Sequence, residues 1–244
     1  MESRKKYLTV ADGSRLFYEI YGQGEPLFLL HGNGNDGSYF AKQIAALKHR
    51  YQLFVIDSRG QGASTNQAQQ ITFSIMADDL KAIMEKEQIT RADLLGFSDG
   101  ANLAMMFAYK YPDRVDRMIL NAGNLTVSGL KTFWLALTYL QYFLCWLPAL
   151  VFTAAKKKLP VIGLMIHDIG LSKHDLTTIA SPTLVIVGKK DVIKLTHTLM
   201  IVHQLPHATF VLVPKQGHRL AQTDAENFNR EVVAFLGGEK NDYP

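Results

Sequence analysis

The chain has 244 residues, enough for one large α/β domain with a small inserted subdomain. An apolar share of 48% with 20% charged residues is typical of a folded protein and excludes a disordered one. The net charge of +4 is mild and most lysines are scattered, so no nucleic-acid partner is expected. Cys145 is the single cysteine and cannot form an internal disulfide, and no signal peptide is recognised, so we expect a cytoplasmic protein.

Strands alternate with helices over the first half of the chain. Residues 7–10 and 15–21 predict an edge hairpin, and the fully apolar residues 27–30 predict a central parallel strand. Further strands are expected at residues 53–56, before Gly96, and at 114–121. Apolar residues at helical spacing fall between them, in one case with Thr72 as the expected N-cap. This alternation predicts an α/β fold with a mostly parallel central sheet and helices on both faces.

The alternation stops after the sixth strand and resumes with strands at residues 182–187 and 209–213. We therefore predict a core of residues 1–123 and 179–244, interrupted by a helical cap (lid) of residues 124–178. The last helix is expected to begin with a capping box, Thr223 with Glu226.

A Gly-x-Ser-x-Gly motif stands between one expected strand and the helix that follows it. Because Gly96 and Gly100 lack a Cβ, the backbone at Ser98 can turn sharply and expose the serine hydroxyl. The N–H of Asp99 then points toward any developing oxyanion. The bare motif also fits a surface turn, but the flanking strand and helix favour a nucleophile.

A serine nucleophile needs a base and an acid, and the chain supplies both after later strands. Ser98, Asp191 and His218 all follow expected strands, where catalytic groups of open α/β sheets lie. An imidazole takes the serine proton, and a buried carboxylate fixes the imidazole tautomer. Asp168 and Asp175 are the next candidates for the acid. His31, which also ends a strand, is expected to shape the oxyanion loop.

Five motifs in this order carry a resemblance to the α/β-hydrolase family over nearly the whole chain. They are His31-Gly32, Asp57-x-Arg59-Gly60-x-Gly62-x-Ser64, Gly96-Phe97-Ser98-Asp99-Gly100, Gly188-x-x-Asp191 and Gly217-His218. The resemblance implies a Ser-His-Asp triad and an oxyanion hole made by the backbone N–H groups of Asn33 and Asp99. The Gly-x-Ser-Asp-Gly form, with Ala122-Gly123-Asn124 downstream, is similar to the biphenyl-hydrolase-like branch, which includes valacyclovir hydrolase. We interpret the loop around Arg59 as structural.

Residues 133–152 of the cap are apolar enough to suggest a membrane span, with Lys156, Lys157 and Lys158 beside them. A single crossing is excluded by topology, because strands on both sides of the segment belong to one sheet. We interpret it as a cap over the serine, with Trp134 and Trp146 lining an acyl or aromatic pocket. Packing on the core and a dimer contact are alternatives, and peripheral membrane contact is less favoured.

These features predict a serine hydrolase that cleaves small to medium carboxylic esters through an acyl-enzyme. The same triad acting on thioester, amide or carbon–carbon bonds is an alternative, as is a hydrolase-fold ligand receptor without activity. No cofactor and no metal are expected, the partner is a small-molecule ester, and the protein is a monomer or homodimer. The Asp99 side chain either binds a substrate cation, such as the α-amino group of an amino-acid ester, or turns outward and caps the following helix.

Overall fold

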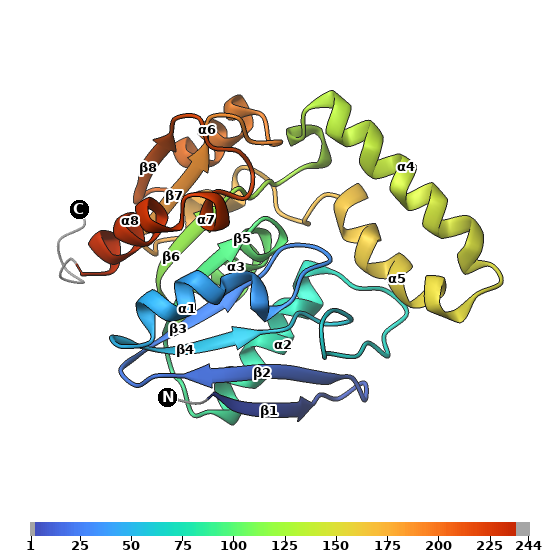
Figure 1. The fold of residues 1–244 in the computed structure, drawn as a ribbon, viewed down its shortest axis with the longest axis horizontal. Helices are drawn as coiled ribbons and strands as arrows, with labels where there is room; N and C mark the ends of the chain where they lie inside the picture. The colour runs from blue at the N-terminus through green and yellow to red at the C-terminus, as the bar shows by residue number, and fades with distance from the viewer. Residues whose placement is uncertain (1–2, 238–244) are drawn as a thin grey trace.

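The computed structural model describes residues 3–237, whose strands form one sheet in the order β1-β2-β4-β3-β5-β6-β7-β8 (Figure 1). The strands are β1 (Arg4–Thr9), β2 (Arg15–Tyr21), β3 (Glu25–Leu30), β4 (Tyr51–Ile56), β5 (Ala92–Phe97), β6 (Val115–Asn121), β7 (Thr183–Gly188) and β8 (Ala208–Val213). β1 and β2 pair antiparallel, β2 pairs antiparallel with β4, and the other pairs are parallel. The predicted mostly parallel sheet is confirmed, while the ends of the predicted core, residues 1–2 and 238–244, lie outside the described residues.

Helices cover both faces of this sheet, as predicted. They are α1 (Ala41–Leu47), α2 (Phe73–Lys86), α3 (Asp99–Lys110), α4 (Thr132–Ala149), α5 (Thr153–Gly163), α6 (Leu195–Gln204), α7 (Leu220–Thr223) and α8 (Ala225–Gly237), with short 3-10 turns η1 (Gly37–Phe40), η2 (Pro112–Arg114), η3 (Val127–Gly129), η4 (Leu164–Ile166) and η5 (Asp175–Thr178). The apolar sides of α2 and α3 join one core cluster, which includes Leu80 and Met106. The apolar sides of α1 and α8 join the other, which includes Leu47 and Phe228. Successive side chains along a central strand point to opposite faces of the sheet, so they enter two separate apolar layers.

Two expected helix starts have different outcomes. Thr72 caps α2 as predicted, because its hydroxyl oxygen accepts a hydrogen bond from the Ile75 N–H (3.2 Å). The predicted capping box at Thr223 is wrong. Thr223 ends the short helix α7, and its hydroxyl donates to the Gln216 side chain and the Arg219 carbonyl, while α8 begins at Ala225.

The segment between β6 and β7 forms a hairpin of two helices, α4 and α5, beside the sheet (Figure 1). Val161 of α5 and Leu164 of η4 are buried in the core cluster around α3. α4 differs, because Thr138 is its single buried residue and most of its large apolar side chains are exposed. The apolar helix that was expected to cover the serine therefore does not pack along the core. None of the helices in residues 3–237 is long and apolar enough to cross a membrane.

Candidate active site

Ser98 occupies the single-residue turn between β5 and α3. Its backbone has φ 53° and ψ −117°, a strained conformation for a residue with a side chain. The Ser98 N–H donates to the carbonyl of Asn121 (2.8 Å), which ties the turn to the end of β6. A Cβ at Gly96 would lie 2.2 Å from the carbonyl oxygen of Gly100, and a Cβ at Gly100 would lie 1.8 Å from that of Leu30, so both glycines are needed for strand and helix to meet so closely. The hydroxyl stands at the N-terminus of α3, the geometry expected of this motif.

The three side chains predicted for catalysis form a chain of hydrogen bonds. Asp191 follows β7 and His218 follows β8, so both lie at the carboxyl edge of the sheet with Ser98. His218 Nε2 lies 3.2 Å from Ser98 Oγ, and His218 Nδ1 lies 2.8 Å from Asp191 Oδ1. Asp191 Oδ1 also accepts from the Ile193 N–H (3.0 Å), and the Phe97 ring packs 5.0 Å from the His218 ring. The imidazole is thus held between a hydroxyl and a carboxylate.

Asp191, the proposed acid, is more deeply buried than Ser98 and His218. Asp191 is 4% exposed, whereas Ser98 and His218 are partly open to solvent. The alternative acids have other partners: Asp168 Oδ1 accepts from the Val127 N–H (2.8 Å), and Asp175 Oδ2 accepts from the Ser172 N–H (2.8 Å). Asp191 is therefore the carboxylate that reaches the imidazole.

The backbone N–H groups of Asn33 and Asp99 have no hydrogen-bond acceptor within residues 3–237. Asp99 N–H is the first of α3, where the helix dipole favours negative charge. The Asn33 loop is positioned by His31, whose Nε2 accepts from the Ser58 N–H (3.0 Å). Burial lowers the pKa of His31, so its neutral ring serves this loop-to-loop contact, in agreement with its expected role. The backbone next to Asn33 lies close to Ser98, since a Cβ at Gly32 would be 3.1 Å from the Ser98 Cβ. The oxyanion hole formed by these two N–H groups stays a prediction.

The Asp99 carboxylate turns inward, so the interpretation that it turns outward is wrong. Its Oδ2 accepts from Asn33 Nδ2 (2.8 Å), and its Oδ1 lies 3.4 Å from Asn102 Nδ2. Burial raises the pKa of Asp99 to about 6, although the hydrogen bond from Asn33 and the charge of His218 act in the opposite direction. A carboxyl group that ionises near pH 6 therefore stands one residue from the proposed nucleophile.

Two side-chain contacts were missed by sequence reasoning. Asn33 Nδ2 also donates to the carbonyl of Val161 in the cap (2.7 Å), so one amide joins Asp99 to α5. Asn102 accepts from the Asn124 N–H (2.7 Å) and thereby fixes the start of the cap segment. Asp99 and Asn102 are three residues apart on a helix, and this spacing is the one signal in the sequence that places their side chains together. No local sequence pattern predicts the contact between Asn33 and Val161.

The two tryptophans predicted to bind substrate both lie on α4. Trp134 is 42% exposed and packs edge-on against Phe133, and Trp146 is 41% exposed and stacks on Phe143. The structure does not bring either ring into contact with the triad, so their role in binding stays a prediction.

The loop that follows β4 makes structural contacts, in agreement with its interpretation. Asp57 accepts from the N–H groups of Gly37 (2.8 Å) and Ala63 (2.7 Å). Arg59 is buried and binds both carboxylate oxygens of Asp79 on α2. These contacts fold the loop against α2.

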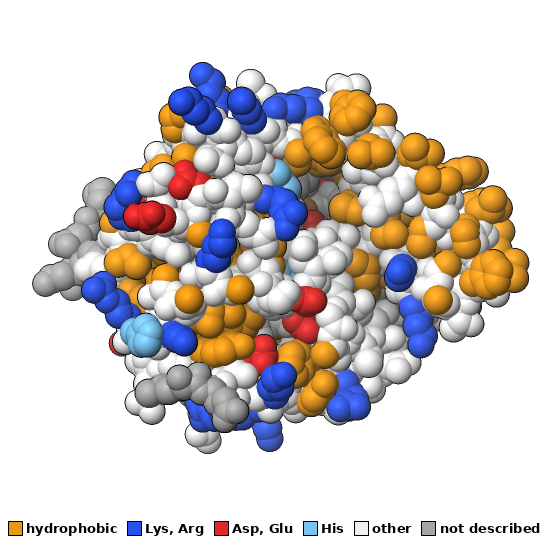
Figure 2. All heavy atoms as spheres, in the orientation of Figure 1, with side chains coloured by type: hydrophobic (Ala, Val, Ile, Leu, Met, Phe, Trp, Pro, Cys, Tyr) orange, Lys and Arg blue, Asp and Glu red, His pale blue; other side chains and the backbone are white. Residues whose placement is uncertain are grey.

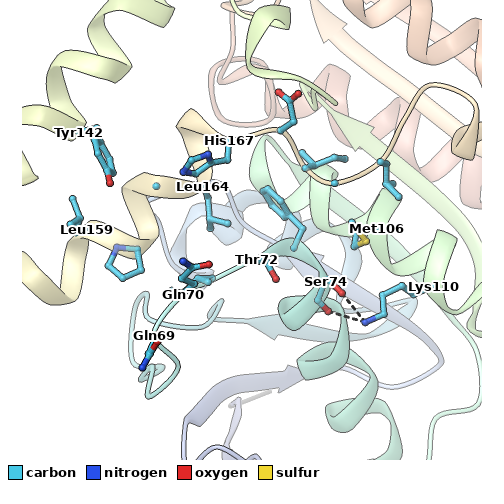
Figure 3. Close-up of a pocket in the computed structure, with 18 of the residues that line it drawn as sticks. Gln69, Gln70, Thr72, Ser74, Met106, Lys110, Tyr142, Leu159, Leu164 and His167 are labelled. Atoms are coloured by element: carbon cyan, nitrogen blue, oxygen red, sulfur yellow. Dashed lines mark hydrogen bonds between the residues drawn. The ribbon is translucent and has the colours of Figure 1, made fainter.

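A cavity of about 850 Å³ opens between the cap and the core, at the ends of α2 and α3 (Figure 3). Leu159 and Leu164 of the cap face Met106 of α3 across it, and Lys110 on its wall donates to the Ser74 hydroxyl (3.0 Å). Ser98, Asp191 and His218 do not line it. Within the described part of the chain, no group of three or more His, Cys, Asp or Glu side chains is placed to hold a metal ion.

A sheet of this topology, with a strained serine turn and a hydrogen-bonded histidine and aspartate at its carboxyl edge, is the arrangement of an α/β hydrolase. Residues 25–159 match the sequence model of the alpha/beta hydrolase fold. The chain belongs to the α/β-hydrolase family.

Similar proteins include hydrolases that match over nearly their whole length. RutD of Caulobacter sp. (strain K31), named as a carbamate hydrolase, is 26% identical, over 92% of this chain and 96% of its own. The 2-hydroxy-6-oxononadienedioate/2-hydroxy-6-oxononatrienedioate hydrolase of Paraburkholderia phymatum is 29% identical, over 95% of each chain. Among solved structures, MGS-M2, an alpha/beta hydrolase enzyme from a Medee basin deep-sea metagenome library, has a TM-score of 0.84 at 20% identity, over 98% of this chain and 99% of that one. These relatives support an enzyme rather than an inactive receptor.

Proposed function

We propose that the protein is a serine hydrolase that cleaves small to medium carboxylic esters through an acyl-enzyme. The observation that carries this proposal is the continuous path from Ser98 Oγ through His218 to Asp191, with distances of 3.2 and 2.8 Å. A small-molecule substrate agrees with the names of the relatives. A cytoplasmic location and a monomeric or homodimeric state stay predictions.

In the proposed reaction, His218 Nε2 takes the proton of Ser98 Oγ while this oxygen attacks the ester carbonyl. The oxyanion receives hydrogen bonds from the N–H groups of Asn33 and Asp99. His218 then returns the proton to the leaving alkoxide, and the acyl group stays on Ser98. Water attacks the acyl-enzyme with His218 again as base, the bond between the acyl carbon and Ser98 Oγ breaks, and His218 returns the proton to Oγ as the carboxylic acid leaves. Asp191 accepts the Nδ1–H throughout, which keeps Nε2 free to act.

Rates on p-nitrophenyl esters from acetate to palmitate, with Ser98→Ala as the blank, test the ester proposal. Hydrolysis that depends on Ser98 and falls with acyl length supports it. The matching anilides and thioesters belong in the same panel, because the two relatives are named for other substrates. Faster turnover of those compounds than of every ester, still dependent on Ser98, would assign the triad to a different bond.

Asp99 is proposed to bind a cationic group of the substrate. Its carboxylate is 6% exposed, adjoins the nucleophile and has no cationic side chain in its hydrogen bonds, which come from Asn33 and Asn102. An ammonium group placed there would stabilise the ionised form that burial disfavours. The competing role is structural, in which Asp99 only orients Asn33 toward the cap.

Asp99→Asn is expected to lower kcat/KM for a p-nitrophenyl valine ester roughly ten- to a hundredfold more than for the isovalerate ester, which lacks only the amino group. A charge-assisted hydrogen bond is worth about 1.5–3 kcal/mol. In the wild type, the ratio of the two kcat/KM values should rise as pH increases through about 6, because Asp99 ionises there. His218 serves both esters, so its contribution cancels in the ratio. If Asp99→Asn lowers kcat/KM equally on both esters, and the wild-type ratio does not change with pH, then the role of Asp99 is structural.

Trp134→Ala is expected to change the ratio of kcat/KM on long and short acyl esters by about tenfold, if this ring lines the acyl pocket as predicted. Leu144→Ala is the matched control, because Leu144 lies on the same helix α4 and is 62% exposed. An equal loss on every ester, together with a lower melting temperature, indicates that Trp134 only packs on its neighbours. The same comparison applies to Trp146→Ala.

A further inference from the structure

Most of the large apolar side chains that are exposed in residues 3–237 lie on α4 and in the turn between α4 and α5. We call this the hairpin surface; its exposed side chains are Phe133, Trp134, Leu137, Tyr139, Leu140, Phe143, Leu144, Trp146, Leu147, Leu150, Val151 and Phe152. Figure 2 shows it as a continuous apolar patch over α4 at one end of the molecule. Monomeric proteins rarely leave such a patch uncovered unless something binds it.

The exposure is greatest where α4 turns into α5. Val151 is 79% and Phe152 is 63% exposed. Leu147 on the last turn of α4 and Leu150 directly after the helix are exposed as well. Pro148 lies in the last turn of α4, and its carbonyl accepts hydrogen bonds from the N–H groups of Val151 and Phe152 (3.0 and 2.8 Å). The tip of the hairpin is therefore a tight, hydrogen-bonded turn that projects apolar side chains into solvent.

Positive charge follows the tip directly. Lys156, Lys157 and Lys158 are exposed in the first half of α5. Residues 124–167 contain these lysines, Lys131 and no aspartate or glutamate. The hairpin thus combines a wide apolar face with uncompensated positive charge, and it adds two tryptophans and a tyrosine at the surface.

We propose that the hairpin surface docks on an anionic lipid bilayer, with the tip around Val151 and Phe152 inserted and Lys156, Lys157 and Lys158 at the phosphates. Lysine beside exposed Trp, Phe and Leu is typical of helices that lie in the membrane interface. Lysine is depleted at protein–protein interfaces, so the charges argue against a second copy of the chain as the occupant. The helices are not long and apolar enough to span the bilayer, so the contact is one-sided. This docking does not depend on the proposed ester hydrolysis.

Sedimentation with vesicles tests the proposal on the full chain. Vesicles of phosphatidylcholine alone are compared with vesicles of phosphatidylcholine and phosphatidylserine, at low and high salt. The wild type is expected to bind the anionic vesicles and to lose binding as salt increases. The triple variant Lys156→Gln, Lys157→Gln, Lys158→Gln should bind on the order of 100-fold more weakly, at about fivefold for each lysine. Val151→Ser with Phe152→Ser should weaken binding with the charge unchanged.

The matched control removes three exposed lysines elsewhere: Lys5→Gln, Lys86→Gln, Lys189→Gln. It has the same formal charge as the hairpin variant and should bind as the wild type does, as should Ser98→Ala. Melting curves by circular dichroism check that each variant is folded. Equal loss in the control variant, or a wild type that stays in solution with both vesicles, overturns the proposal. A wild-type dimer that Val151→Ser with Phe152→Ser converts to a monomer, without vesicle binding, would assign the surface to a second copy instead.

Discussion

Replacing Ser98 by alanine is expected to lower kcat on the preferred ester by on the order of 10⁴ to 10⁶-fold. Without Oγ no acyl-enzyme forms, and only the oxyanion donors and substrate binding remain to assist attack by water. The variant should fold normally, because Ser98 Oγ is partly exposed and its recorded hydrogen bond is with His218. Steady-state kinetics with a melting curve measure both quantities on the same preparation.

His218→Ala and Asp191→Asn are also expected to lower kcat by several orders of magnitude. The first removes the base, and the second allows the imidazole to adopt the wrong tautomer, at a cost of about 10⁴-fold. The three groups act as a unit, so each double variant should lose little more than the worse single variant. Additive losses would contradict the shared role.

Asp175→Asn is the matched control for Asp191→Asn, because its carboxylate binds its own loop through Ser172. It should leave kcat unchanged. Labelling by a fluorophosphonate separates an inactive serine from a poorly chosen substrate: the wild type should react and Ser98→Ala should not. Full activity in Asp191→Asn would transfer the role of the acid to another residue.

Much of the fold follows from local patterns. The buried strand β3 is a continuous run of leucine and phenylalanine at residues 27–30, and α2 combines a 3.6-residue apolar repeat with the cap Thr72. The site candidates were predictable for a related reason. Parallel strands place their carboxyl ends at one edge, so residues that follow β5, β7 and β8 lie at the same edge of the sheet. Because β8 is three strands from β5, the loop after β8 must also reach back for His218 to contact Ser98.

The conformation of the cap could not be predicted in this way. The sequence of α4 shows that its side chains are mostly apolar, but it does not predict what covers them. A buried helix, a pocket wall and an exposed docking surface can have the same hydropathy. The structure distinguishes them, because Thr138 is the single buried residue of α4 and its large apolar side chains are mostly exposed. The contact from Asn33 to the Val161 carbonyl is similar, because it joins residues 128 positions apart through one amide. The predicted start of the last helix was wrong for a local reason, since Thr223 ends α7 and does not cap α8.

Gly100→Ala is expected to lower the free energy of unfolding by about 3 kcal/mol or more. A Cβ at this position would lie 1.8 Å from the carbonyl oxygen of Leu30 and 2.9 Å from that of His31. Both contacts are with backbone, so no side chain can rotate away, and α3 must separate from β3. For a chain of this size the melting temperature should fall by about 6–12 °C.

Gly34→Ala is the control without a clash. Unlike Gly100, Gly34 has a positive φ, +70°, but no atom lies within 4 Å of the position that its Cβ would take. Its substitution should cost only the backbone strain, about 1 kcal/mol. In Gly100→Ala, any protein that still folds should also have a lower kcat, because movement of α3 displaces the Asp99 N–H from the proposed oxyanion site. Equal melting temperatures for the two variants would mean that strand and helix can separate at little cost, and that the tight turn at Ser98 does not depend on Gly100.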